Sequence, residues 1–243
     1  MGDRVLEIGP GSIRVGRFIG RLGVVPMPAV EHGLGLVDRV VRRHVAKLEK
    51  VGWCARVPAT RGDGMLVWMT ATGLQGVGLA ELPAPRAPAR FSPQTMHSVR
   101  VAWAAADIEH AGHRWIAGRE LALAPDGWGA KIANERGGYS RRLPDLVFWP
   151  ARDPARQAAV VICPGLTNPR RQRAALECWQ RSILAGQYAQ VHYLANPAFV
   201  SHLKGVAKAV GVAPQLIISE QVIADEHPAL APVIESVDKQ SAA

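Results

Sequence analysis

The spacing of hydrophobic and polar positions predicts three helices in the first fifty residues. Residues 12–22 carry an apolar face, and Gly23 follows as a terminator. Residues 27–32 fit a short second helix that begins among prolines, which are tolerated in a first turn. Residues 36–50 show the clearest helical period of the sequence. We therefore expect a small helical assembly at the start of the chain.

The predicted third helix has one apolar stripe and one basic stripe. The apolar stripe follows the i, i+4, i+8, i+11 spacing and consists of Val37, Val41, Val45 and Leu48. The basic residues fall on the opposite face: Arg39, Arg42, Arg43, Lys47 and Lys50. Such a helix can pack on a domain and face a phosphate backbone, although an ordinary solvated face has the same pattern. His44 falls on the apolar side, so we expect it to be partly buried and not to read bases.

Two short apolar runs after this helix predict a β-hairpin. Residues 54–57 and 65–69 are the strands, and the glycine-containing stretch 61–64 supplies the turn. Three helices followed by a hairpin, with the third helix basic, is the order of a winged helix-turn-helix. The third helix would then enter the major groove, and Arg56 and Arg61 of the wing would contact phosphates.

A proline-rich stretch divides the sequence. Residues 80–93 favour extended, semi-rigid chain and are interpreted as a linker. The predicted organisation is a winged-helix domain at 1–79, this linker, an α/β domain at 94–219 and a tail at 220–243. The fold class is therefore α/β with two domains.

The second domain has a predicted order of helix, three strands, helix, strand, helix and strand. This is an αβββαβ core with one further helix and strand at its end. Residues 124–140 are rich in glycine and polar groups and are expected to form an irregular loop. The predicted helices are 94–111, 169–185 with Asn168 as its N-cap, and 197–210. The predicted strands are 115–123, 143–149, 158–163, 190–195 and 216–219.

Composition narrows the class of protein. The 243 residues contain no apolar run that approaches the ~18 residues needed to span a bilayer, and the beginning of the sequence does not resemble a secretory signal. We expect a cytoplasmic protein without a membrane partner. Cys54, Cys163 and Cys178 include no CxxC pair, so they are interpreted as buried small hydrophobes and not as disulfides or zinc ligands.

Charge points to a partner. The formal net charge is +9, and the sequence pI is about 10.1. Residues 1–92 contribute +6, from 13 basic and 7 acidic residues, and residues 93–243 contribute +3, from 16 and 13. A chain with this excess of arginine commonly binds a polyanion, and nucleic acid is the first candidate.

The order of elements and a few short motifs resemble a known family. A Pro-Asp dipeptide at Pro144-Asp145 begins a predicted core strand, as in the PD-(D/E)xK restriction-endonuclease-like fold. The whole chain resembles the replication-relaxation family of bacterial plasmids and phages, which joins a winged helix to such a core. The resemblance covers Leu48–Gly73, Arg141–Phe148 and Val160–Gly211.

The sequence departs from the family pattern where catalysis would need it. The family's glutamate positions correspond here to Cys163 and Gly165, and its lysine position to Pro169, which Arg170 follows. Phosphodiester hydrolysis in this fold requires carboxylates that hold Mg²⁺ and a nearby lysine. Asp145 alone is a poor magnesium site, so we expect a degenerate domain without a metal or other cofactor. Its vestigial candidates are Asp145, Glu120 and Arg170.

These features predict a sequence-specific double-stranded DNA-binding protein. It would act as a transcriptional regulator or as a replication or mobilisation accessory factor of a phage or plasmid. A replication protein, a relaxase or a second copy of the chain would be its protein partner. The alternative is a metal-dependent DNA nuclease or nickase that uses Asp145 and Mg²⁺.

Overall fold

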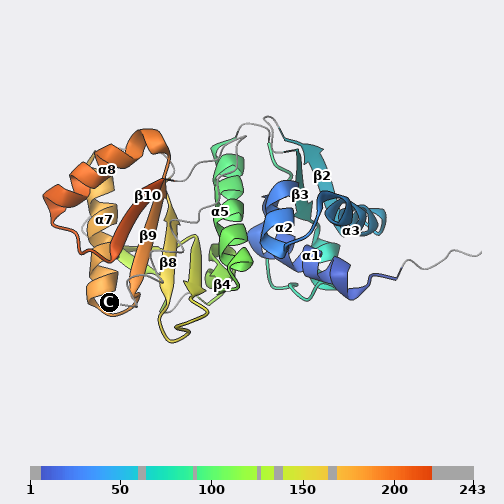
Figure 1. Cartoon of the computed structure of the whole chain (residues 1–243), viewed down its shortest axis with the longest axis horizontal. Coiled ribbons are helices and arrows are strands. Elements are labelled where there is room, and N and C mark those ends of the chain that lie inside the picture. The colour runs from blue at the N-terminus through green and yellow to red at the C-terminus, as the bar shows by residue number, and fades with distance from the viewer. Residues whose placement is uncertain are drawn as a thin grey trace, which may run out of the picture. The chain divides into compact units, whose positions relative to one another are not determined.

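The computed structural model of the chain describes residues 7–59, 64–89, 92–124, 127–133, 139–163 and 169–220. Within these ranges the protein is α/β, with eight helices and ten strands. The chain divides into two compact units, Met1–His110 and Ala111–Ala243. The strands form a three-stranded sheet in the first unit and a five-stranded and a two-stranded sheet in the second (Figure 1).

The first unit begins with the predicted helices and one additional strand. Amphipathic spacing produces the helices, whose apolar faces meet in a common core with Phe18, Val30 and Val45 fully or almost fully buried. Proline at the first or second position begins two of them, as the sequence indicated. The elements are α1 (Pro10–Leu22), β1 (Val24–Pro26), α2 (Met27–Leu34) and α3 (Asp38–Lys50).

A three-stranded antiparallel sheet completes this core. The predicted hairpin is formed by β2 (Cys54–Pro58) and β3 (Met65–Met69), and β3 also pairs with β1. The strand order is β1-β3-β2. The sequence analysis did not predict β1, because three residues between two helices are too short to show an alternating pattern.

A threonine–glycine pair closes the hairpin onto the end of α3. Thr70 caps α4 (Ala71–Gly76) by accepting a hydrogen bond from the Gly73 amide at 3.1 Å, and its hydroxyl donates to the Gly52 carbonyl at 2.7 Å. A Cβ atom on Gly73 would lie 1.8 Å from the Trp53 carbonyl oxygen. This position therefore requires glycine, and the contact ties α4 to the turn between α3 and β2.

Helix α5 (Pro93–His110) belongs to the first unit, whereas the sequence analysis grouped 94–111 with the second domain. The helix packs against α2 and β1. The His32 ring bonds the buried Asp107 carboxylate at 2.7 Å and stacks on His110. The division between units thus falls after α5 and not in the proline-rich stretch, because α5 covers an apolar face of α2.

The second unit is built on a five-stranded mixed sheet. The strand order is β10-β9-β8-β7-β4, with β4, β7 and β8 antiparallel and β8, β9 and β10 parallel. Helices α7 and α8 pack against one face of the sheet, over a core that contains Trp179 and Leu203 (Figure 1). The elements are β4 (Arg114–Ala117), β7 (Leu146–Trp149), β8 (Ala158–Ile162), α7 (Pro169–Leu184), β9 (Gln190–Ala195), α8 (Pro197–Val210) and β10 (Leu216–Glu220).

Two local predictions for this unit are wrong. The strand predicted at 115–123 ends at Ala117, and the chain turns into the short helix α6 (Gly118–Leu121) because the Glu120 carboxylate accepts the Ala117 amide at 2.9 Å. The segment predicted as irregular contains an antiparallel pair of strands, β5 (Ala130–Ala133) and β6 (Tyr139–Arg142). The predicted tail beyond 220 and the predicted cap Asn168 lie outside the described residues.

Candidate nucleic-acid interface

Helix α3 buries one face and presents a basic face to solvent. Val41, Val45 and Leu48 are fully buried against the rest of the first unit. Val37, which the sequence analysis placed on the same apolar stripe, is instead 68% exposed, because α3 begins at Asp38, two residues later than predicted, and Val37 is its N-cap. The exposed residues that we call the α3 basic face are Arg39, Arg42, Arg43, Lys47 and Lys50.

Only one member of the α3 basic face forms an ion pair within the described part of the chain. The Arg42 Nε donates to both carboxylate oxygens of Asp38, at 2.6 and 2.8 Å, one helical turn earlier. For the other four members, no ion-pair partner is found among the described residues. Exposed cations without counter-charges retain their full attraction for an external polyanion. This is the arrangement that phosphate contacts require.

The predicted wing adds one described cation beside α3. Arg56 on β2 is exposed, and its Nε lies 3.1 Å from the Glu49 carboxylate near the end of α3. The pair ties the hairpin to the helix, but it partly neutralises Arg56. Arg61, the other predicted wing residue, lies outside the described residues. The amide of Ala59 donates to the Gly64 carbonyl at 2.8 Å, which closes the hairpin on either side of that stretch.

His44 is half-buried between α3 and α1, as predicted. Its Nδ1 lies 2.9 Å from the Ser12 hydroxyl, and a Cβ on Gly11 would lie 2.8 Å from its ring. Burial lowers the pKa of His44, and the positive charges of Arg43 and Lys47 lower it further. The ring therefore fixes α1 against α3 in its neutral form, while the cations around it face outward.

Net charge does not distinguish the two units once the boundary is known. Residues 1–110 contain 14 basic and 9 acidic residues, a net +5, and residues 111–243 contain 15 and 11, a net +4. The +6 and +3 of the sequence analysis depended on a boundary before α5. In the first unit, five exposed cations lie on one face of α3, and four of them have no ion-pair partner among the described residues.

In the second unit, the predicted vestigial residues serve the local fold. One Asp145 carboxylate oxygen accepts the Ile162 amide at 2.7 Å, and the Asp145 backbone bonds Val160 and Gly118. The Glu120 carboxylate caps α6. A Cβ on Gly118 would lie 2.9 Å from the Pro144 carbonyl oxygen, so α6 begins directly against the Pro-Asp turn. Both carboxylates are thus committed to backbone amides.

The residues present fit magnesium poorly. Cys163, which the sequence resemblance aligns with a glutamate position, is buried, and the Tyr193 side chain bonds to it. A thiol is a soft ligand, whereas Mg²⁺ prefers carboxylate and water oxygens. Among the described residues, no group of three or more histidine, cysteine or carboxylate side chains is placed to hold a metal ion. Cys54, Cys163 and Cys178 are all buried, as predicted.

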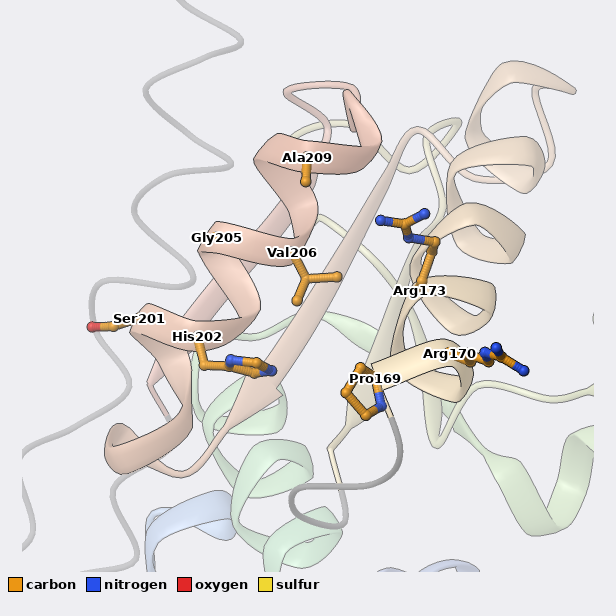
Figure 2. Close-up of a pocket in the computed structure, with 8 residues that line it drawn as sticks. All are labelled: Pro169, Arg170, Arg173, Ser201, His202, Gly205, Val206 and Ala209. Atoms are coloured by element: carbon orange, nitrogen blue, oxygen red, sulfur yellow. The ribbon is translucent and has the colours of Figure 1, made fainter.

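Arg170 lines a groove between α7 and α8. The groove has a volume of about 540 Å³, and its lining includes neither Asp145 nor Glu120. Figure 2 shows the His202 ring and the Arg173 side chain directed between the helices, whereas Arg170 points away. The Nε2 of His202 lies 3.0 Å from the Gln172 amide oxygen. Of the three vestigial candidates, this groove therefore contains Arg170 alone.

Comparison with family models and with curated proteins gave no match to this chain. None of the helices in the described ranges has both the length and the apolar character that crossing a bilayer demands.

The sequence analysis missed one residue of the interface. Asp38 was not singled out, although it stands four residues before Arg42, the spacing at which opposite charges meet on a helix. Glu31 of α2 is a second acid beside it. Burial raises the pKa of Glu31, and the charge of Asp38 raises it further. The spacing from Asp38 to Arg42 was visible in the sequence, whereas the approach of Glu31 depends on how α2 packs.

Proposed function

We propose that this chain is a sequence-specific double-stranded DNA-binding protein whose first unit is a winged helix-turn-helix. The observation that carries the proposal is the α3 basic face, four of whose five cations have no ion-pair partner among the described residues. A helix with buried apolar and free basic faces can enter a major groove with one side while the other holds it on the domain.

The connectivity of the first unit supports the same proposal. The order α1, β1, α2, α3, β2, β3 and the sheet order β1-β3-β2 place a helix pair directly before a hairpin. In this assignment α2 and α3 are the helix-turn-helix, α3 is the recognition helix, and the β2–β3 hairpin is the wing. The exposed Arg56 on β2 then lies where a wing contacts phosphates.

For the second unit we propose a degenerate nuclease-like domain without catalysis. The strand order and the Pro144-Asp145 turn are consistent with the resemblance to the replication-relaxation family. Asp145 and Glu120 hold backbone amides, which gives both carboxylates a structural role. The unit would supply contacts to a second copy or to a replication protein or relaxase, and the protein would act in the cytoplasm as a regulator or accessory factor.

Binding of a mixed-sequence duplex, followed by fluorescence anisotropy over a salt series, tests the proposal. Arg43→Ala and Lys47→Ala should each weaken binding by several-fold. Each should also reduce the slope of log K against log salt by about 0.9, because one phosphate contact is lost. Lys204→Ala removes the same charge from an exposed position on α8 and is the matched control.

The outcomes separate clearly. Loss of affinity and of slope in the α3 variants, with wild-type behaviour of Lys204→Ala, supports DNA binding through α3. If the wild-type protein retains no duplex at low salt, the proposed function is wrong. Equal weakening by all three substitutions would show a diffuse charge effect, and the recognition-helix assignment would then be rejected.

A further inference from the structure

We infer that Arg42, held in place by Asp38, is the residue of α3 that reads a guanine in the major groove. The inference deepens the proposed function and rests on it. Its basis is the difference between Arg42 and the other cations of the α3 basic face. Among these five cations, only Arg42 has its guanidinium bonded to a carboxylate of the described residues. The Arg42 side chain is also exposed.

The pair with Asp38 leaves the two terminal nitrogens of the Arg42 guanidinium able to contact a base. Asp38 engages the Nε with both of its oxygens, at 2.6 and 2.8 Å. No hydrogen bond from the two terminal nitrogens is found among the described residues. These nitrogens form the fork that pairs with the O6 and N7 acceptors of guanine, the commonest specific contact of arginine with DNA. The Arg42 and Asp38 side chains are 60% and 51% exposed, so the fork is accessible to a base edge.

Holding the Arg42 guanidinium in one orientation lowers the entropy that is lost when it pairs with a base. A free arginine must give up the freedom of its long side chain when it pairs with a base. An arginine already oriented by a carboxylate has lost part of that freedom before DNA arrives, which favours a contact of defined geometry. Arg39, Arg43, Lys47 and Lys50 lack such a partner in the described residues, which suits phosphate contacts that tolerate many geometries.

Asp38 is itself positioned from both elements of the helix pair. It is the first residue of α3, and Glu31 of α2 lies against it. An acid in the first turn of α3 also opposes the approach of phosphates, so Asp38 reduces general affinity for DNA. A residue that weakens general binding but orients a base-reading side chain improves discrimination between sequences.

The chain offers a matched pair for comparison. Arg56 and Glu49 form a second arginine–carboxylate pair through the same Nε atom, at 3.1 Å and with 35% and 38% exposure. This pair joins the end of α3 to the hairpin, away from the start of the helix that contacts base edges in helix-turn-helix proteins. Removing either carboxylate changes the net charge equally, and only removal of Asp38 should change sequence preference.

The test is selection of bound sequences from a randomised duplex pool, followed by affinity measurements on the selected duplex and its single-base variants. The proteins compared are the wild type, Arg42→Lys, Asp38→Ala and Glu49→Ala. We expect the wild type to select a guanine whose replacement weakens binding about 10-fold or more. Arg42→Lys and Asp38→Ala should lose most of that discrimination, whereas Glu49→Ala should keep it.

Affinity for a mixed-sequence duplex shows whether Asp38 acts by positioning Arg42, or whether a variant has only changed its charge or failed to fold. On a mixed-sequence duplex, Arg42→Lys should bind as the wild type does, because the charge is retained. Asp38→Ala and Glu49→Ala should both bind more tightly, because each loses a negative charge. Thermal melting of the four proteins identifies a variant that fails to fold, and Arg42→Lys keeps the test decisive if Asp38→Ala does.

Two different failures can be told apart. If the wild type retains no duplex from the pool at low salt, the proposed function is wrong, and this inference falls with it. If the wild type selects a site but Arg42→Lys or a folded Asp38→Ala keeps the full guanine preference, DNA binding stands and the inference is overturned. Loss of guanine preference in Glu49→Ala to the same extent would also overturn it.

Discussion

The α3 basic face and the turn around Asp145 are both rich in charged side chains, but the fold uses them differently. Asp145 and Glu120 each accept a backbone amide, so removing either carboxylate affects how its own strand or helix is held. Arg39, Arg43, Lys47 and Lys50 have no ion-pair partner among the described residues. Charged groups that the fold does not use are the better candidates for binding a ligand. The comparison also separates two kinds of variant: those that lose stability and those that lose binding.

The largest expected effect comes from disturbing the contact between α4 and the turn that follows α3. Gly73→Ala would place a Cβ atom 1.8 Å from the Trp53 carbonyl oxygen, so the backbone of α4 or of the turn must move. We expect the free energy of unfolding of the first unit to fall by about 3 kcal/mol, at the upper end of ordinary single substitutions. Urea unfolding measures the change, and DNA binding should be lost in parallel.

Gly205→Ala is the control for this substitution. Gly205 lies within α8, and a Cβ atom there meets no other atom within 4 Å. Alanine should therefore raise stability by up to about 1 kcal/mol, because it restricts the unfolded chain and favours helix. A Gly73→Ala variant as stable as the wild type would contradict the described contact between α4 and Trp53.

A second effect, confined to the other unit, depends on pH. His192 on β9 is fully buried, and neither ring nitrogen has a hydrogen-bond partner among the described residues. Burial lowers its pKa to about 4, so the ring is neutral in the folded state, whereas the unfolded histidine takes up a proton near pH 6.5. Its contribution to stability is therefore complete above pH 6.5 and is lost as pH falls towards 4, by about 3 kcal/mol.

His192→Leu should remove that loss. Urea unfolding of the wild type and the variant at neutral and acidic pH measures the difference, and at neutral pH the variant should be no less stable. His44→Gln is the comparison, since His44 is only half-buried and is bonded to Ser12. An acid sensitivity that His192→Leu leaves unchanged would assign the effect to another group.

The smallest expected effect is that of replacing Asp145, and it tests most directly whether this carboxylate has a structural role. Asp145→Ala leaves the amide of the buried Ile162 without its acceptor, which costs about 2 kcal/mol, and Asp145→Asn should restore most of it. Neither variant should change affinity for DNA. Incubation of supercoiled DNA with Mg²⁺ and each protein tests the nuclease alternative directly. If the wild type cleaves the DNA and Asp145→Ala does not, Asp145 is catalytic, and the contrast drawn between it and the α3 basic face is wrong.

Much of the fold could be predicted because its apolar patterns are strong and local. Residues 65–69 and 190–195 were predicted as strands with their observed bounds, and the helix ending before Gly211 was placed correctly. Elements held by single side chains were not predictable in this way. The turn at Glu120 depends on one hydrogen bond, and β1 consists of three residues whose partner strand is about forty residues away.

The candidate site was predictable in part for the same reason. Helical spacing alone placed the five cations opposite the apolar stripe. It did not reveal that Arg56 of the hairpin is paired, because Arg56 meets Glu49 only after the hairpin has folded back along α3. The exposure of Val37 also depends on where α3 begins, because Val37 is the N-cap and lies outside the helix.

The position of α5 determines where the chain can be cut. Gly33 of α2 is so close to α5 that a Cβ there would lie 3.0 Å from the Ala106 Cα. A recombinant fragment that ended in the proline-rich stretch would uncover this surface and the buried side of β1, and it would tend to aggregate. The shortest soluble DNA-binding fragment should therefore extend to His110. The proline-rich stretch thus lies within the first unit and not between the two units.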